Sequence, residues 1–280
     1  MRRTALAAVL TAMILSHSGC GGGSTGELTD AVAETTADWL LLDLANGTVT
    51  PKATVADLDT NPKYRDRVMV FRRIEGGSSA QGQAAGSFAA QADETPDTAS
   101  LPHYYVGVFE ITQAQWVRLA GTRPWQDLPS GLVVAGLNDE RAPAFNLGRN
   151  EVRTRMTSAG ASLGVRLALP TDAQWERAAR GGTTGIFAWG DSRDTTVADT
   201  MALISETGAG RTGPEEVGQR EANAVGLFDV HGNVWEVTSE GNLRGGSWHD
   251  SLAMARCANK LELDPDTVYA TVGARLVLVP

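Results

Sequence analysis

One short segment constrains the fold of this chain more than any other: residues 226–236, which read GLFDVHGNVWE. The segment mixes large apolar, glycine and acidic residues without the two-residue period of a strand or the 3.6-residue period of a helix. A second segment of this kind, RGGSW, follows at residues 244–248. Long loops without regular structure are usually functional or pinned. We therefore expect irregular backbone here, held by buried side chains or by a metal ion.

The N-terminus has the pattern of an export signal. Arg2 and Arg3 supply positive charge, and the apolar run at residues 5–15 is too short to cross a hydrocarbon core of about 30 Å as a helix. Two small residues then precede Cys20, which resembles a bacterial lipoprotein signal with Cys20 as the lipidation site. The alternative is an ordinary secretory signal that is cleaved nearby.

This pattern sets the expected organisation of the chain. Residues 1–20 would be the lipoprotein signal peptide, residues 21–38 a flexible tether, and residues 39–280 one domain. Within the domain, residues 76–100 are rich in Gly, Ala, Gln, Ser and Thr, and we predict a mobile surface loop there. The expected location is the bacterial cell envelope, with a lipid anchor in the outer membrane or at the cell surface.

Charge and cysteine content exclude several functions. The 24 Lys and Arg residues against 33 Asp and Glu give a net charge of −9, which disfavours nucleic acid as a partner because phosphate binding needs clustered cations. The two cysteines are Cys20 and Cys257. If Cys20 carries lipid, Cys257 has no disulfide partner within the chain, and no Cys/His metal cluster can be formed.

Local patterns predict several regular elements. Two helix starts show capping boxes, Thr112 with Gln115 and Thr171 with Gln174, and each helix should stop at a following glycine. A third helix is expected over about residues 149–163, where apolar residues recur on one face. Strands are predicted at residues 39–44, 68–71 and 104–111, with shorter pieces around 234, 244–248 and 275–279.

Six segments, in order, resemble the formylglycine-generating enzyme family, the sulfatase-modifying factors. The resemblance covers roughly residues 66–280 and implies an α+β, C-type-lectin-like fold, with a mixed sheet, flanking helices and extensive ordered loops. The matching segments are residues 109–116, 166–182, 187–190, 226–236, 244–248 and 273–276.

The resemblance also shows what this chain lacks. Enzymes of the family oxidise a substrate cysteine with copper held by two cysteines, and here the first of these positions falls near Asp250. A copper(I) site needs soft ligands, and the single thiol of Cys257 cannot form a two-thiolate site. We therefore expect no copper and no catalytic residue. An iron-dependent branch of the family is disfavoured as well, because the sequence has no HxxxH or HExxH spacing.

The family commonly holds calcium at the segment around residues 229–236. Calcium accepts carboxylate and carbonyl oxygens together, so a structural calcium ion is the implied cofactor. The alternative is that the two carboxylates cap turns or pair with Arg244 or Arg275. The implied ligands are the side chains of Asp229 and Glu236 and the carbonyl groups of Gly232 and Val234.

Residues 249–271, the C-terminal face, occupy the position of the family's exposed ligand surface. Apolar and aromatic residues in a loop-rich surface favour contact with a protein or a cell-surface ligand. The pattern resembles the variable region of lectin-fold proteins diversified by retroelements, although drift in a non-catalytic paralogue is an equal alternative. The expected contact residues are His249, Asp250, Ser251, Leu252, Leu261, Leu263, Tyr269 and Thr271.

The sequence thus favours a non-catalytic binding protein, anchored to the membrane by its N-terminal lipid and presenting its C-terminal face to a partner. Two alternatives remain open at this stage. One is an oxidoreductase of the formylglycine-generating type, or a degenerate paralogue that uses Cys257. The other is a structural envelope lipoprotein without a ligand at this face.

Overall fold

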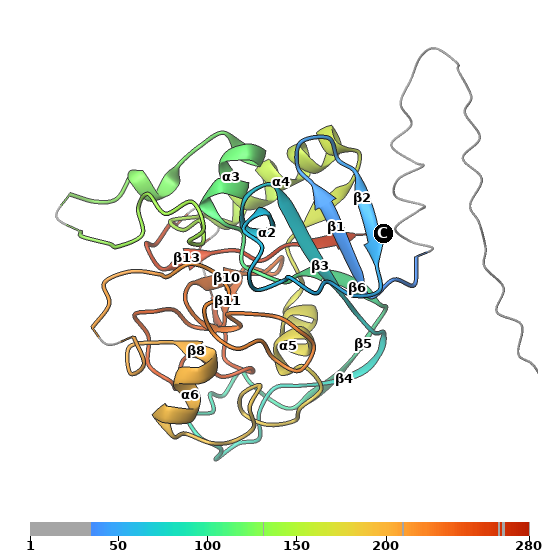
Figure 1. Cartoon of the computed structure of the whole chain (residues 1–280). Coiled ribbons are helices and arrows are strands. Elements are labelled where there is room, and N and C mark those ends of the chain that lie inside the picture. The colour runs from blue at the N-terminus through green and yellow to red at the C-terminus, as the bar shows by residue number, and fades with distance from the viewer. Residues whose placement is uncertain (1–34, 131, 209, 263, 265–266, 280) are drawn as a thin grey trace, which may run out of the picture.

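The computed structural model describes residues 35–130, 132–208, 210–262, 264 and 267–279 (Figure 1). The expected signal peptide, Cys20 and most of the tether lie outside these residues. The larger sheet is antiparallel, with the strand order β2-β1-β3-β6-β14-β7. Its strands are β1 (Trp39–Asp43), β2 (Val49–Lys52), β3 (Val68–Ile74), β6 (Tyr104–Gly107), β7 (Arg166–Ala168) and β14 (Val277–Val279).

A smaller mixed sheet carries the two irregular segments found in the sequence. Its order is β12-β11-β10-β13, and β10 and β13 run parallel. Two further pairs complete the strands: an antiparallel hairpin of β4 and β5, and a short parallel pair of β8 and β9. The bounds are β4 (Gly77–Gln81), β5 (Asp97–Leu101), β8 (Ala202–Leu203), β9 (His231–Gly232), β10 (Trp235–Val237), β11 (Asn242–Arg244), β12 (Leu261–Glu262) and β13 (Val272–Gly273).

Both predicted capping boxes are present, and the three predicted helices form. Thr112 and Thr171 each accept a bond from the backbone N–H three residues on, while the glutamine there bonds back. None of the helices in the described residues is long and apolar enough to cross a bilayer. The helices are α2 (Lys63–Asp66), α3 (Gln113–Ala120), the 3-10 turn η1 (Pro124–Gln126), α4 (Arg149–Leu163), α5 (Asp172–Arg180) and α6 (Thr195–Met201).

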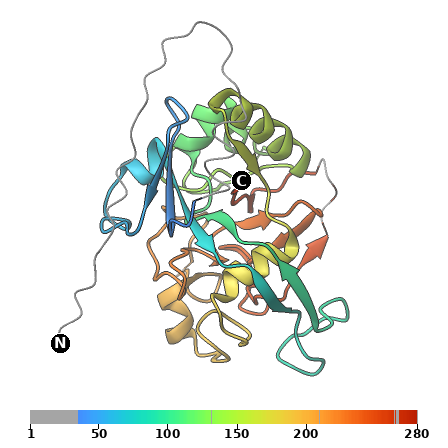
Figure 2. The same ribbon diagram turned by 90° about the vertical axis from the view of Figure 1, so that its right-hand side faces the viewer.

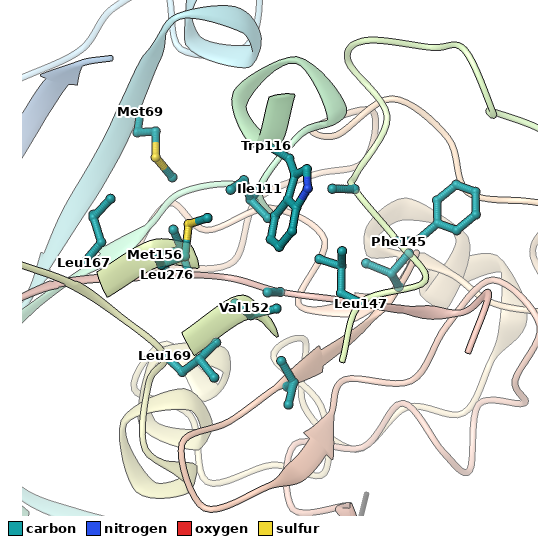
Figure 3. Packing of buried hydrophobic residues seen from close by; sticks show 14 of the residues in the cluster. Met69, Ile111, Trp116, Phe145, Leu147, Val152, Met156, Leu167, Leu169 and Leu276 are labelled. Carbon is teal, nitrogen blue, oxygen red and sulfur yellow. The ribbon is translucent and has the colours of Figure 1, made fainter. Parts of the chain in front are cut away.

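The central strands of the larger sheet are buried on both faces, because successive residues point alternately into two apolar clusters, whereas the edge strand β2 is mostly exposed. Phe71 and Tyr105 point into the cluster that contains Trp116 of α3 and Met156 of α4. Figure 3 shows Trp116 near the centre of this cluster, close to the side chains of α4. The neighbouring strand residues point to the opposite face, where Trp175 of α5 packs. One helix layer therefore covers each face of the sheet.

The prediction of a mobile loop at residues 76–100 is wrong at both ends. Residues 77–81 and 97–101 pair as the β4–β5 hairpin, and Figure 2 shows it at the lower end of the molecule beside α5. Small and polar residues do not exclude a strand when neighbouring elements supply hydrogen bonds. Arg177 of α5 donates to the carbonyl groups of Gly76, Gly77 and Ser78. Tertiary contacts here outweigh a composition that disfavours strands.

Three other boundaries differ from the predictions. The strand expected at 104–111 ends at Gly107, and the strand expected at 68–71 continues to Ile74. The piece expected at 244–248 contributes to β11 only through Arg244, because Gly245 and Gly246 adopt positive φ values of 89° and 77°. This left-handed backbone suits glycine and breaks the strand.

Candidate functional site

The centre of the irregular region is a buried ion pair between Glu236 of β10 and Arg275. Both side chains are about 1% exposed, and the shortest N–O distance is 2.6 Å. Trp175 Nε1 also donates to Glu236, at 2.6 Å. Burial by itself favours the neutral guanidine, but the adjacent Glu236 carboxylate outweighs it and raises the pKa of Arg275. The pair and the Trp175 bond therefore join β10, the C-terminal segment and α5.

Arg275 also organises the loop that leads into β10. Its Nη1 donates to the carbonyl groups of Gly107 and Val108 at 3.0 and 2.8 Å, and its Nη2 donates to the carbonyl of Phe228 at 2.8 Å. Each bond satisfies a buried backbone acceptor that would otherwise be costly. One guanidinium group thus holds residue 228 of the loop against the end of β6.

Two more buried carboxylates lie in this region. Asp229 has a φ of 57° and accepts a bond from the Gly218 N–H at 2.6 Å, and burial raises its pKa to about 6. Glu110 accepts bonds from Asn233 Nδ2 at 2.6 Å and from the Val234 N–H at 3.0 Å. Burial and the charge of Asp229 raise the pKa of Glu110 well above its usual value. Glu110 therefore fixes the turn at residues 233–234.

These partners bear on the calcium expected at residues 229–236. Both oxygens of Glu236 accept bonds from the cationic guanidinium of Arg275, which would repel an adjacent metal ion. No group of three His, Cys, Asp or Glu side chains in the described part of the chain has metal-binding geometry. The donor set therefore does not fit a calcium ion well. The alternative pairing with Arg275 is present, whereas Arg244 pairs with Glu176.

The C-terminal face divides into exposed and buried residues. His249 and Tyr269 are exposed, and Tyr269 retains 52% of its surface. Leu252 is only 6% exposed and packs with Phe187 and Ala255, so the prediction that it contacts a partner is wrong. The sequence signal was ambiguous because a leucine in an irregular segment can point to either side.

Most of the other predicted contact residues are only partly accessible to a binding partner, because they already make contacts within the protein. Asp250 accepts a bond from the Ser247 hydroxyl, which orders the turn after the RGGSW segment. Leu261 packs against the main core from β12, and the Thr271 carbonyl accepts a bond from the Trp235 N–H. Ser251 is half-buried, and Leu263 lies outside the described residues.

The β4–β5 hairpin is fixed to the underside of this face. Arg256 Nη2 donates to Glu94 Oε1 at 2.7 Å, Nη1 binds the other carboxylate oxygen, and both side chains are fully buried. Gln83 Oε1 accepts a further bond from Arg256 at 3.1 Å, and Gln91 donates to Asn259 at 3.0 Å. The connection between β4 and β5 is therefore part of the support for the face.

Cys257 and His231 are structural groups. Cys257 is fully buried, and burial raises the pKa of its thiol to about 12, so almost no thiolate exists at neutral pH. His231 Nε2 accepts a bond from the Ala188 N–H at 3.0 Å, and Nδ1 lies 2.6 Å from the Ala255 carbonyl. Burial lowers the pKa of His231 to about 4, which keeps the ring neutral.

The sequence did not indicate Glu94, Glu110 or Glu176 as organising residues, whereas Arg256 was expected to be part of the framework. Glu94 lies in a low-complexity segment without a periodic signal. Glu110 and Glu176 lie within segments that match the family motifs, yet only their zero or near-zero exposure reveals their role. The position of Glu110, directly after the strand-like run at 104–109, was a weak signal. Its partners, Asn233 and Val234, are more than a hundred residues away in the sequence.

The architecture defines a class: the C-type-lectin-like fold in its sulfatase-modifying-factor form. The chain belongs to the family of sulfatase-modifying factor enzyme 1-like domains, whose model matches residues 54–279. Among solved structures, it is similar to Treponema denticola variable protein 1, with a TM-score of 0.64 and 19% identity over 76% of this chain and 96% of that chain. PvdO from Pseudomonas aeruginosa gives a TM-score of 0.65 and 19% identity, with 75% and 94% covered.

The curated relatives include proteins named as enzymes and proteins named as inactive. The formylglycine-generating enzyme of Mycobacterium tuberculosis is 42% identical over 78 residues, which is 25% of this chain and only 26% of that protein. Chaperone protein LppX of Paenibacillus barcinonensis is 25% identical over 64% of this chain and 81% of its own. Inactive C-alpha-formylglycine-generating enzyme 2 of Bos taurus is 31% identical over 38% of this chain and 42% of its own. Family membership therefore does not determine catalysis.

Proposed function

We propose that this chain is a non-catalytic binding protein, anchored by lipid at Cys20 to the bacterial cell envelope, whose C-terminal face contacts a protein or a cell-surface ligand. The observation that carries the non-catalytic part is the state of two side chains that follow the RGGSW segment, Asp250 near the expected first copper cysteine and Cys257, the single thiol of this segment. Asp250 is a carboxylate bonded to Ser247, and Cys257 is a fully buried thiol. Neither supplies the exposed thiolate that cysteine oxidation by copper requires.

The binding part is supported by the exposed end of the C-terminal face. Val268 and Tyr269 are 47% and 52% exposed, and solvent-exposed aromatic residues are frequent anchors in interfaces. The face rests on the rigid Arg256–Glu94 pair, so a partner would meet a preorganised surface. The structural likeness to a protein named a variable protein supports the further proposal that a retroelement diversifies this face.

The catalytic alternative is tested with copper and a cysteine-containing peptide. We expect the purified chain, incubated with copper(I) and the peptide under oxygen, to leave the peptide mass unchanged, as the Cys257→Ala variant should. Conversion of the peptide cysteine to an aldehyde by the wild type alone would overturn the non-catalytic assignment and restore the oxidoreductase alternative.

The binding role is tested by photocrosslinking in the native host. A photoreactive phenylalanine analogue is placed at position 269, and at position 133 as a control, because Val133 is 80% exposed but lies outside the C-terminal face. We expect a discrete adduct from position 269 and none from 133. Absence of an adduct at 269, with normal expression and folding, would favour a structural envelope protein. Palmitate labelling that is lost in Cys20→Ser tests the anchor separately.

A further inference from the structure

A cleft at the C-terminal end of α5 is strongly cationic. It lies between the end of β3, strand β4 and the loop after α5, and its volume is about 320 Å³. Sites for small molecules commonly measure about 300 to 1,000 Å³, so this cleft suits a small group. Four arginines and a single carboxylate line it: Arg72, Arg73, Arg177, Arg180 and Glu75.

The positive charge of the cleft is only partly balanced. Every hydrogen bond that the structure gives the Arg177 guanidinium goes to a neutral carbonyl group, those of Gly76, Gly77 and Ser78. Arg180 shares the carboxylate of Glu176 with Arg244, so two guanidinium groups face one negative charge. The chain as a whole is acidic, with a net charge of −9, so the electrostatic potential in this cleft has the opposite sign to the average over the protein.

The remaining two arginines have weakly held partners. Arg72 pairs with Asp38, whose side chain is 55% exposed, and Arg73 pairs with Glu75, whose side chain is 69% exposed. Ion pairs with exposed carboxylates typically contribute only about 0–1 kcal/mol and are screened by salt. Arg73 Nε is buried and has no hydrogen-bond partner among the described residues. One donor of Arg73, an arginine that lines the cleft, is therefore not used by the protein.

The end of α5 offsets part of this charge but not all of it. A helix C-terminus carries roughly half a negative charge, and Arg177 and Arg180 lie in the last turn, where cations are favourable. The four arginines that line the cleft have three partner carboxylates in the described residues, Asp38, Glu75 and Glu176, and Glu176 is shared with Arg244 outside the cleft. The cleft therefore keeps an excess of positive charge.

We propose that this cleft is a binding site for a phosphate-type oxyanion. Guanidinium groups bind such anions through paired, charge-assisted hydrogen bonds, and the cleft has the size and the positive charge for one phosphate group. A phosphate could come from a lipid headgroup or from a free phosphate compound, and the two sources share this chemistry.

The location of the cleft favours the headgroup as the source. The Asp38 carbonyl accepts bonds from the Arg73 N–H and from Arg72 Nη1, so the described chain enters the domain beside the cleft. This step rests on the proposed lipid anchor at Cys20. An anchor at Cys20 would tether the domain to the bilayer through the end of the chain that enters beside the cleft.

Phosphate binding is tested by calorimetry on the purified full-length protein in a neutral detergent at low ionic strength. We expect saturable binding of inorganic phosphate, weakened at least about tenfold in Arg73→Gln and in Arg177→Gln. Arg118→Gln is the matched control, because it removes one charge from an exposed pair with Asp66 outside the cleft. Arg73→Gln keeps the test valid if loss of the Arg177 bonds loosens β4. Absence of saturable binding, or equal affinity in both cleft variants and wild type, would overturn the proposal.

The source of the phosphate is separated by competition. Micelles that contain phosphatidylglycerol should displace inorganic phosphate, whereas micelles with zwitterionic phosphatidylcholine should do so much less. Equal and weak effects of both lipids, with phosphate binding intact, would support the site and assign it to free phosphate compounds. If palmitate labelling shows no anchor at Cys20 but phosphate still binds, the proposed membrane anchoring is wrong and the proposed anion site is still supported.

Discussion

Arg256 and Glu94 lie 162 positions apart in the sequence and form a two-point ion pair in which both side chains are fully buried. Arg256 belongs to the C-terminal face, and Glu94 belongs to the connection between β4 and β5. The pair therefore couples a segment of low complexity to the surface that we propose for partner binding. Flexibility at either segment should affect the other.

Breaking this pair should destabilise the protein strongly. Glu94→Gln leaves the Arg256 guanidinium buried without a counter-charge, which typically costs about 3–5 kcal/mol. Chemical denaturation should show this loss, and hydrogen exchange should rise at residues 77–101 and 249–259 together. The control is Asp66→Asn, which breaks an exposed pair and should cost less than about 1 kcal/mol. Equal effects of the two variants would show that the buried pair has no special role.

Calcium should not contribute to stability if the ion pair of Glu236 and Arg275 is the native arrangement. We expect the melting temperature of the purified protein to be the same with a chelator as with millimolar calcium. Glu236→Gln should lower it strongly in both conditions, because it leaves Arg275 buried without its counter-charge. A marked loss of stability on chelation in the wild type would restore calcium as a structural cofactor.

Because His231 is neutral in the folded protein, we expect the stability of the protein to depend on pH. Its pKa is lowered from 6.5 to about 4 in the folded protein, chiefly by burial, so the unfolded chain binds a proton more readily between these values. The contribution of neutral His231 to the free energy of unfolding is complete above pH 6.5. It is lost as the pH falls toward 4, at up to about 1.4 kcal/mol per pH unit. The free energy of unfolding should therefore fall less steeply with acid in His231→Gln than in wild type.

A matched control for this pH effect is His249→Gln, because His249 is exposed at the surface. This variant should keep the steep wild-type slope between pH 6.5 and 4. If His231→Gln also kept that slope, protonation of His231 would not be the cause.

The thiol of Cys257 should be inert in the folded protein. Burial raises its pKa to about 12, and only the thiolate reacts readily with alkylating reagents. Iodoacetamide should modify Cys257 only under unfolding conditions, as followed by mass spectrometry of the peptide that contains it. Rapid modification of the native protein would instead show an accessible, activated thiol and would favour the oxidase alternative.

Local signals predicted the helices well but the hairpin poorly. Thr112 and Thr171 cap their helices through contacts within three residues, so their information is present in the sequence itself. Strand β4 is held by its pairing with β5 and by bonds from Arg177 of α5, whereas its composition alone predicts a loop. The same distinction applies to the site, where Cys257 and Asp250 could be assessed from motifs but the burial of Leu252 could not.

The sequence by itself determined the family, the positions of α3, α4 and α5 and the lack of a thiol pair, because each depends on residue identity and short-range spacing. Only the tertiary structure decided which charges are paired. Glu236 with Arg275, Glu94 with Arg256, and Arg177 with carbonyl groups alone all join segments far apart in the chain. The physical reason is that desolvation and Coulomb energy depend on three-dimensional position, and no local pattern records it.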